Sequence, residues 1–467
     1  MDIPLTITET QKGLLEKKFT AVDLVDAYLA RIKAFDKDIN AFITVSDELA
    51  YAQAKEADQK IAELGKKAFE QFPLLGVVTA YKDIFLTKGL RTTAASKVLE
   101  SYVPPYSATS VERLTDAGAI CIGKTNLDAW AHGSSGENSD FGPTKNPWNK
   151  EYVPGGSSSG AGASPAANFS LIATGTDTCG SIRLPANYCG LVGLKPTYGA
   201  VSRYGIIAMA SSLDTVGHLT RSVDDARTVF NITKGEDGKD GVVKNMPMTS
   251  TDKKLKIGIP KEFFVEGLDS EVRKSIDEVI EFYKRHDVEF VEVSLPHMKY
   301  GISVYYIIQP AEVSSNLARY DGIRYGNARS TFSDEAKRRI MLGSYVLSSG
   351  YYDAYYLKAM KVRTIIRTEV NEIFEKVDAM IAPVAPTPPF KLGAKVDDPL
   401  QMYLTDVYAA TANLTGIPSL AIPSGFTKNG LPLGFQLMGP RFAEETLFTL
   451  GEMYQKETTF HLKAAKL

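Results

Sequence analysis

Cysteine, histidine and long apolar runs are all scarce in this sequence of 467 residues. The three cysteines, Cys121, Cys179 and Cys189, form no C-x-x-C pair, which argues against a disulfide framework and against a zinc site. No apolar run is long enough to cross a bilayer, and the first residues lack the basic and apolar regions of a secretion signal. We therefore predict a cytoplasmic protein with no membrane contact and no bound metal.

Net charge is also nearly absent. The formal net charge of -2 provides no overall attraction for nucleic acid, so any such contact would need a local basic patch or a partner subunit. With 44% hydrophobic and 23% charged residues, the composition is instead that of an ordinary globular protein.

Short apolar runs alternate with amphipathic stretches along the chain. Between Thr20 and Lys33 the apolar residues fall on one helical face, and Thr20 with Asp23 resembles a capping box. A second helical pattern begins near Val272. The apolar runs expected as strands are residues 75–78, 120–122, 171–173, 257–259, 288–293, 379–381 and 420–422. This alternation predicts an α/β fold with a mixed central β-sheet flanked by helices on both faces.

No internal repeat or clean boundary divides the chain. The polar stretch 235–254 and the proline-rich stretch 383–389 are expected to be loops. We predict a single domain over residues 1–467, with a helical segment at about 1–70, a core at about 71–230 and a C-terminal part at about 255–467. Four tyrosines between residues 351 and 356 have a spacing typical of a core or an interface.

Two segments combine glycine and serine unusually: Pro-Gly-Gly-Ser-Ser-Ser-Gly at 154–160, and Thr-Asp-Thr-Cys-Gly-Ser-Ile-Arg at 176–183. A flexible linker would have a similar composition, but the second segment directly follows an apolar run, which favours packed structure. Residues 156–160 also fit the G-x-S-x-G turn of a Ser-His-Asp hydrolase. No histidine after them has a sequence context that favours a catalytic base, so this alternative is weak.

Residues 118–125 match the phosphate-binding pattern G-x-x-x-x-G-K-T letter for letter. A phosphate loop turns its backbone N–H groups inward, whereas the intervening Ala-Ile-Cys-Ile has the composition of a strand. An NTPase built on Lys124 therefore stays an alternative, as does a non-enzymatic scaffold.

Four motifs resemble the amidase signature family: Tyr81-Lys82-Asp83, the turn at 155–158, the segment 177–183, and Gly193-Leu194-Lys195-Pro196-Thr197. The resemblance spans essentially the whole chain and implies an amide-hydrolysing enzyme. It assigns the nucleophile to Ser181, the bridging serine to Ser157 and the base to Lys82. The side chains expected to support these groups are Ser158, Asp177 and Arg183.

The chemistry of these residue types agrees with the resemblance. A lysine amine can take the proton of a serine only when it is neutral, and burial and positive neighbours lower a lysine pKa. The oxyanion hole is expected from the backbone N–H groups of Thr178, Cys179, Gly180 and Ser181. Family members usually carry glycine at the position of Cys179, so a positive φ there would strain this backbone.

Within the family, the chain resembles the glutamine-hydrolysing subunits of tRNA-dependent amidotransferases. The matching stretches are residues 137–139, 145–148, 197–199, 211–214, 314–322 and 338–343. The resemblance implies that Tyr305, Arg339 and Asp406 bind glutamine, and these types suit its α-carboxylate and α-ammonium groups. It also implies a heterotrimer with two partner subunits, with no cofactor in this chain and with ATP, Mg and most of the tRNA contact at the partner.

Residues 128–132, Asp-Ala-Trp-Ala-His, depart from the Asp-Glu-Phe-Ala-Met that is usual in this group. Trp130 and His132 are therefore expected to reshape the wall of the glutamine pocket. The alternative function is a free-standing amidase of the same family that acts on another small or peptidic amide.

Overall fold

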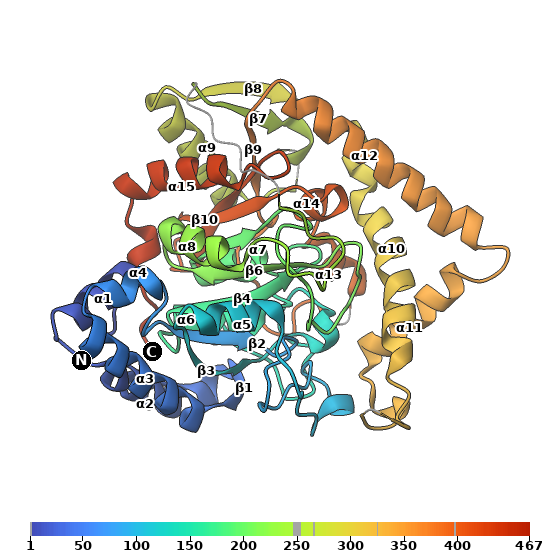
Figure 1. The fold of residues 1–467 in the computed structure, drawn as a ribbon. Helices are drawn as coiled ribbons and strands as arrows, with labels where there is room; N and C mark the ends of the chain where they lie inside the picture. Colours follow the sequence, from blue (N-terminus) through green and yellow to red (C-terminus); the bar gives the residue numbers. More distant parts are fainter. Residues whose placement is uncertain (1, 246–253, 265–266, 325, 397) are drawn as a thin grey trace.

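One mixed sheet of eleven strands organises the computed structural model, which describes residues 2–245, 254–264, 267–324, 326–396 and 398–467 (Figure 1). The strand order is β1-β3-β2-β4-β6-β5-β10-β11-β9-β7-β8. The strands are β1 Phe42–Val45, β2 Val78–Lys82, β3 Ile120–Thr125, β4 Ile172–Asp177, β5 Val192–Lys195, β6 Thr215–Thr220, β7 Lys256–Pro260, β8 Glu289–Val293, β9 Ala379–Pro383, β10 Ser419–Phe426 and β11 Pro432–Met438.

The middle of the sheet is antiparallel, whereas β3, β2 and β4 on one side and β9, β7 and β8 on the other are parallel. The predicted mixed α/β fold is confirmed. The carboxyl ends of the parallel neighbours β2 and β4 lie at the same edge of the sheet, the position where α/β proteins place their ligands.

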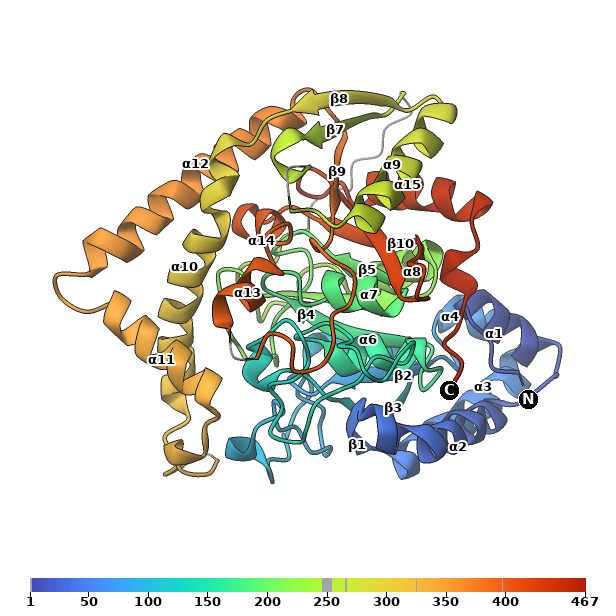
Figure 2. The same cartoon turned by 180° about the vertical axis from the view of Figure 1, so that it is seen from behind.

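Helices cover both faces of the sheet (Figures 1 and 2). On one face α5, α8 and α15 pack in a row, and on the other α6 packs against α7 (Figure 2). The helices are α1 Ile7–Leu15, α2 Ala21–Ile39, α3 Asp47–Leu64, α4 Lys67–Gln71, α5 Thr109–Asp116, α6 Ser159–Ala166, α7 Arg183–Cys189, α8 Val223–Thr233, α9 Ser270–Arg285, α10 Gly301–Asn316, α11 Asp334–Val346, α12 Lys358–Phe374, α13 Pro399–Leu404, α14 Ala410–Thr415 and α15 Glu444–Glu457.

Sequence predictions that concern a single helix or strand agree with the structure in the following cases. Thr20 and Asp23 form the predicted capping box at the start of α2, which continues to Ile39 and ends at the left-handed Asn40. Each predicted apolar run overlaps or adjoins a strand. The strand β6 was not predicted because it alternates Thr and His with apolar residues, although the whole strand is buried. The predicted loop at 235–254 lies partly outside the described residues.

Helices α10, α11 and α12 extend from the body as an arm (Figures 1 and 2). The rings of Tyr345, Tyr351 and Tyr355 cluster on this arm, with centroids 4.3 to 6.4 Å apart, and all three are exposed. The tyrosines at 351 and 355 are therefore not core residues, and their role in an interface stays a prediction. Within the described part of the chain, every helix is too short or too polar to cross a membrane.

Candidate active site

Lys82 occupies the carboxyl end of β2, and its side chain is fully buried. Its Nζ lies 2.8 Å from Ser157 Oγ, 2.9 Å from Ser158 Oγ and 3.0 Å from Thr176 Oγ1. The neighbouring strand β4 supplies Thr176, so the parallel pairing of β2 and β4 positions this contact. An ammonium donates to all three hydroxyls, whereas a neutral amine donates two hydrogens and accepts one.

Burial is the cause of the unusual acidity of Lys82. It lowers the pKa of the lysine to about 7, although the carboxylates of Asp128, Asp214 and Asp177 act in the opposite direction. Of the two general causes of a lowered lysine pKa, burial and positive neighbours, only burial acts here, because the charged groups around Lys82 are acidic. Near neutral pH a substantial fraction of this amine is uncharged, as a general base requires.

Ser157 follows a cis peptide bond after Gly156 and lies one residue before Ser158, the N-cap of α6. Asp128 holds this turn from two sides: its N–H donates to Ser157 O at 3.1 Å, and its carboxylate accepts from the N–H groups of Gly136 and Asn138. A Cβ on Gly156 would lie 2.0 Å from Asp128 Oδ2, so only glycine fits there. The Gly-Ser segment is thus packed structure rather than a linker.

Ser181 lies in the turn between β4 and α7, and it keeps a small exposed area. Its carbonyl accepts a hydrogen bond of 3.2 Å from Ser158 N, so the two serine segments are adjacent. Among the contacts of the described residues, no hydrogen bond joins Ser181 Oγ to Ser157 Oγ. The structure therefore brings Lys82 and Ser157 into direct contact, and it places Ser181 beside them without the last link of the predicted relay.

Asp177 and Arg183 form a buried, two-pronged ion pair of 3.0 and 3.1 Å that spans the turn carrying Ser181. Burial by itself would raise the pKa of Asp177, but Arg183 outweighs it and lowers the pKa to about 2. Arg183 also donates to Gln436 on β11 and to Asn413 on α14. This pair ties the turn to two segments far away in the sequence.

The turn from Thr178 to Ser181 differs from expectation at two residues. The positive φ of +96° falls on Gly180 rather than Cys179, so the cysteine is not strained as the sequence had suggested. The Gly180 N–H donates to Asp177 Oδ1 at 2.7 Å and is not free for an oxyanion. Burial raises the pKa of the Cys179 thiol well above its usual value, which disfavours the thiolate that a cysteine nucleophile needs.

The structure rules out the phosphate-loop and the Ser-His-Asp interpretations of the two other sequence motifs. Residues 120–125 form strand β3, and Lys124 pairs with Asp83 at 3.1 Å in the interior, so this segment is not a phosphate loop. Ser158 contacts Lys82 instead of a histidine. Three of the four histidines after it bond elsewhere: His218 to Thr233, His286 to Glu457 and His297 to Glu369. The fourth, His461, lies near Arg221. No group of three His, Cys, Asp or Glu side chains suited to a metal occurs among the described residues.

The three predicted glutamine-binding residues meet around Tyr306, which the sequence did not single out. Tyr306 donates to Asp406 Oδ2 at 3.3 Å, lies 4.7 Å beneath the guanidinium of Arg339, and packs edge-on against Tyr305. Ser134 also donates to Asp406 Oδ2, at 2.7 Å. A tyrosine one position further along α10 thus links side chains from α10, α11 and the loop before α14.

Arg339 and Asp406 are both buried beside a cavity whose wall includes Arg339, Tyr306 and Ser134. The guanidinium donates to Glu335 Oε1 and to Gln309 Oε1, each at 2.7 Å, which leaves further N–H donors for a ligand. Burial raises the pKa of Asp406 to about 7, although hydrogen bonds from Ser134 and Tyr306 oppose this. A bound cation would stabilise its ionised form.

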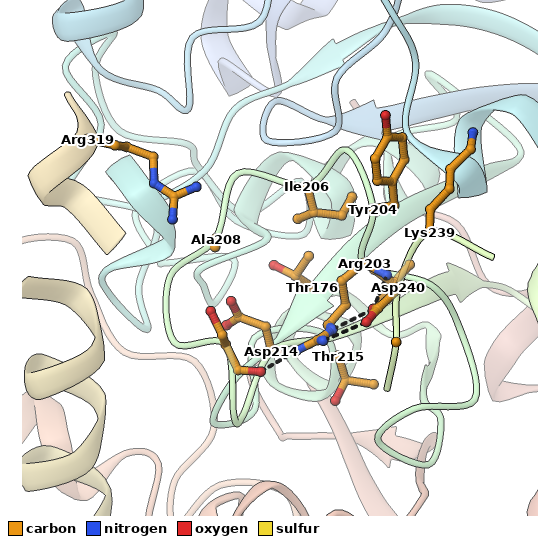
Figure 3. Close-up of a pocket in the computed structure, with 13 residues that line it drawn as sticks. Thr176, Arg203, Tyr204, Ile206, Ala208, Asp214, Thr215, Lys239, Asp240 and Arg319 are labelled. Carbon is orange, nitrogen blue, oxygen red and sulfur yellow. Dashed lines mark hydrogen bonds and ion pairs between the residues drawn. The ribbon is translucent and has the colours of Figure 1, made fainter. Parts of the chain in front are cut away.

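A second cavity lies on the side of Thr176, and none of Lys82, Ser157 and Ser181 belongs to its wall (Figure 3). Its wall includes Thr176, which contacts Lys82, and Asp214, which accepts a 2.7 Å hydrogen bond from the Thr178 hydroxyl. Figure 3 shows Arg203 in this wall, paired with Asp240. Thr176 therefore separates Lys82 from this cavity, which is distinct from the one beside Arg339.

Comparison with known proteins agrees with this geometry. A family model described as Amidase matches residues 23–448, which is most of the chain. The chain belongs to the amidase family. A curated amidase relative from Geobacter metallireducens, named as the A subunit of glutamyl-tRNA(Gln) amidotransferase, is 50% identical over 483 residues and covers 99% of both chains. A relative of the same name from Coxiella burnetii is 47% identical, again over 99% of both.

Solved amidase structures share the whole fold. The crystal structure of the glutamyl-tRNA(Gln) amidotransferase A subunit from Thermotoga maritima is 36% identical, with a TM-score of 0.83 and complete coverage of both chains. Peptide amidase from Stenotrophomonas maltophilia is 28% identical, with a TM-score of 0.82 over 99% and 97% of the two chains. Amidases with different names thus share one scaffold, so the fold alone does not identify the amide that is cleaved.

Proposed function

We propose that this chain hydrolyses glutamine as the A subunit of a tRNA-dependent amidotransferase. The observation that carries the proposal is the buried Lys82, whose pKa is lowered to about 7 and whose amine contacts Ser157 at 2.8 Å. The full-length likeness to amidotransferase A subunits at up to 50% identity supports the choice of substrate.

In the first half-reaction neutral Lys82 takes the proton of Ser157, and Ser157 takes that of Ser181. Ser181 Oγ attacks the side-chain amide carbon of glutamine and forms a C–O bond, while the carbonyl π electrons move to oxygen. With the Gly180 N–H bonded to Asp177, the N–H groups of Thr178, Cys179 and Ser181 are the candidates for stabilising this oxyanion. The relay then returns the proton to the amide nitrogen, the C–N bond breaks, and ammonia leaves a glutamyl ester on Ser181.

In the second half-reaction water attacks the ester carbon, and the same relay removes its proton. The C–O bond to Ser181 breaks, which releases glutamate and restores the hydroxyl. Ser158 and Thr176 hold Lys82 in place through both steps by their hydrogen bonds to its amine. Side chains and backbone groups of this chain carry every step.

Glutamine recognition is proposed to use Arg339 for the α-carboxylate, Asp406 for the α-ammonium, and Tyr305 for a further hydrogen bond. Polar groups of this kind in a buried pocket make binding selective, because a ligand that lacks one matching group leaves a buried side chain unpaired. We further propose that the ammonia is used by two partner subunits in a heterotrimer. The partner makes most of the contact with misacylated Glu-tRNA(Gln), which is activated there with ATP and Mg.

The proposal is tested by measuring ammonia release from glutamine by the purified chain, alone and with its two partner subunits. We expect hydrolysis that rises when the partners, ATP and Glu-tRNA(Gln) are present. Replacing Arg339 by methionine should raise KM for glutamine by about 100-fold. Removing one partner of a buried, hydrogen-bonded charge pair weakens binding by roughly 2 to 5 kcal/mol. Lys337→Met is the matched control, since Lys337 is exposed on the same helix and is not part of the cavity wall. Hydrolysis of peptide amides in preference to glutamine would instead favour the free-standing amidase.

The pH dependence tests the base and the pocket together. Lys82 must be neutral and Asp406 ionised, and both groups have a pKa of about 7, so activity should rise with pH through that value. Below pH 7, log(kcat/KM) is expected to fall with a slope approaching 2. In Asp406→Asn only the lysine titrates, so the slope should approach 1 at a lower overall activity. A flat profile between pH 6 and 8 would contradict both assignments.

A further inference from the structure

The side chain of His132 is buried without hydrogen bonds. It is only 2% exposed, and neither Nδ1 nor Nε2 has a partner among the described residues. Its backbone, in contrast, is well held: the N–H donates to Ala129 O, and the carbonyl accepts from Asn138 Nδ2 at 3.0 Å. Buried polar groups are nearly always paired, so an imidazole fixed in this way with both nitrogens free indicates a ligand.

The chain enters the wall of a cavity directly after His132. The three residues after it, 133–135, line the cavity together with Asn138 and Arg339. Ser135 Oγ and Glu137 Oε2, which belong to the same wall, are also buried without a partner, as is Nε2 of Gln309, which binds Arg339 through its oxygen. Several donors and acceptors around one polar cavity are therefore left for a polar ligand to satisfy.

The charge state of His132 restricts what it can bind. Burial and the nearby positive charge of Arg339 lower the pKa of the imidazole well below its usual value, so the ring is neutral. A neutral imidazole offers one N–H donor and one acceptor nitrogen. The group of the proposed substrate that would face Arg339 is the α-carboxylate, which accepts hydrogen bonds. A buried carboxylate can accept more hydrogen bonds than one guanidinium donates to it, so it needs a further donor.

We propose that His132 donates a hydrogen bond to the α-carboxylate of bound glutamine beside Arg339, and so acts as a specificity-determining residue of this chain. This inference rests on the proposed glutaminase function. The guanidinium supplies the charge, whereas the imidazole sets the orientation of the carboxylate plane. The α-ammonium stays with Asp406.

The test measures binding and turnover in parallel. Dissociation constants of glutamine are measured by calorimetry in a Ser181→Ala background, and kcat and KM are measured with Ser181 intact. His132→Phe should weaken glutamine binding and raise KM by about 10- to 100-fold, the usual effect of one hydrogen bond to a charged group, with kcat changed only a few-fold. His132→Gln, which retains a neutral N–H donor, should recover a large part of the loss.

Two substrate analogues locate the contact. Glutaramate is glutamine without the α-amino group. The change from wild type to His132→Phe should weaken its binding as much as it weakens the binding of glutamine. The analogue 4-aminobutanamide lacks the carboxylate and should bind wild type and His132→Phe equally. An equal loss with all three ligands would mean a structural role and would overturn the inference. A loss confined to 4-aminobutanamide and glutamine would assign the contact to the ammonium and overturn it as well.

His461→Phe is the matched control, because His461 is another buried histidine with an unpaired Nδ1 but packs near Arg221. It should leave all three affinities unchanged. Wild-type chain that fails to bind glutamine would remove the proposed function together with this inference. Normal glutamine binding that His132→Phe does not alter would remove the inference alone.

Discussion

Replacing Ser181 by alanine should lower kcat for ammonia release from glutamine by on the order of 10⁴-fold or more, because no other group can form the ester. Cys179 cannot take over, since its thiol is buried and its raised pKa keeps it protonated. The measurement is a single-turnover assay with labelled glutamine, in which the wild type forms a glutamyl-enzyme and Ser181→Ala does not.

Lys82→Met should cause a similar loss, since methionine fills much of the same volume but cannot accept a proton. The double variant Lys82→Met/Ser181→Ala should be little worse than either single variant, because residues that act as one unit give non-additive losses. Lys256→Met serves as control, since this lysine is half exposed at the first residue of β7. Full activity in Lys82→Met would exclude the relay and require another base.

Replacing Arg183 by methionine should destabilise the fold by about 3 to 5 kcal/mol, the usual cost of removing one partner of a buried ion pair. The carboxylate of Asp177 would remain fully buried without its guanidinium, and Gln436 and Asn413 would lose a shared donor. The free energy of unfolding is measured by denaturant titration, and activity should fall because the turn that carries Ser181 loses its anchor.

Two further variants separate the charge from the packing. Asp177→Asn/Arg183→Met removes both charges and should recover part of the lost stability. Arg273→Met removes the exposed pair with Asp277 on α9 and should change the unfolding free energy by less than about 0.5 kcal/mol. An Arg183→Met protein as stable as the wild type would show that the pair contributes nothing net.

Several features of this protein were determined by the sequence over short distances. The capping box at Thr20 starts α2, and the apolar run at 120–122 lies in β3 despite its match to a phosphate loop. The Gly-Ser turn and the segment around Ser181 carry enough specific residues to indicate the amidase family, which the family model confirms. Such signals depend on neighbours within a few residues, because over that distance the spacing in the sequence largely fixes the positions of the residues in space.

Only the tertiary structure decided how the side chains act on one another. The residues next to Lys82 in the sequence made its desolvation plausible, but only the fold shows that burial lowers its pKa against the opposing charges of three aspartates. Tyr306, rather than Tyr305, connects Arg339 to Asp406, and Thr176 reaches Lys82 across two paired strands. These contacts join residues up to 100 positions apart. Their distances and burial follow from strand order and helix packing, which no local pattern of residues encodes.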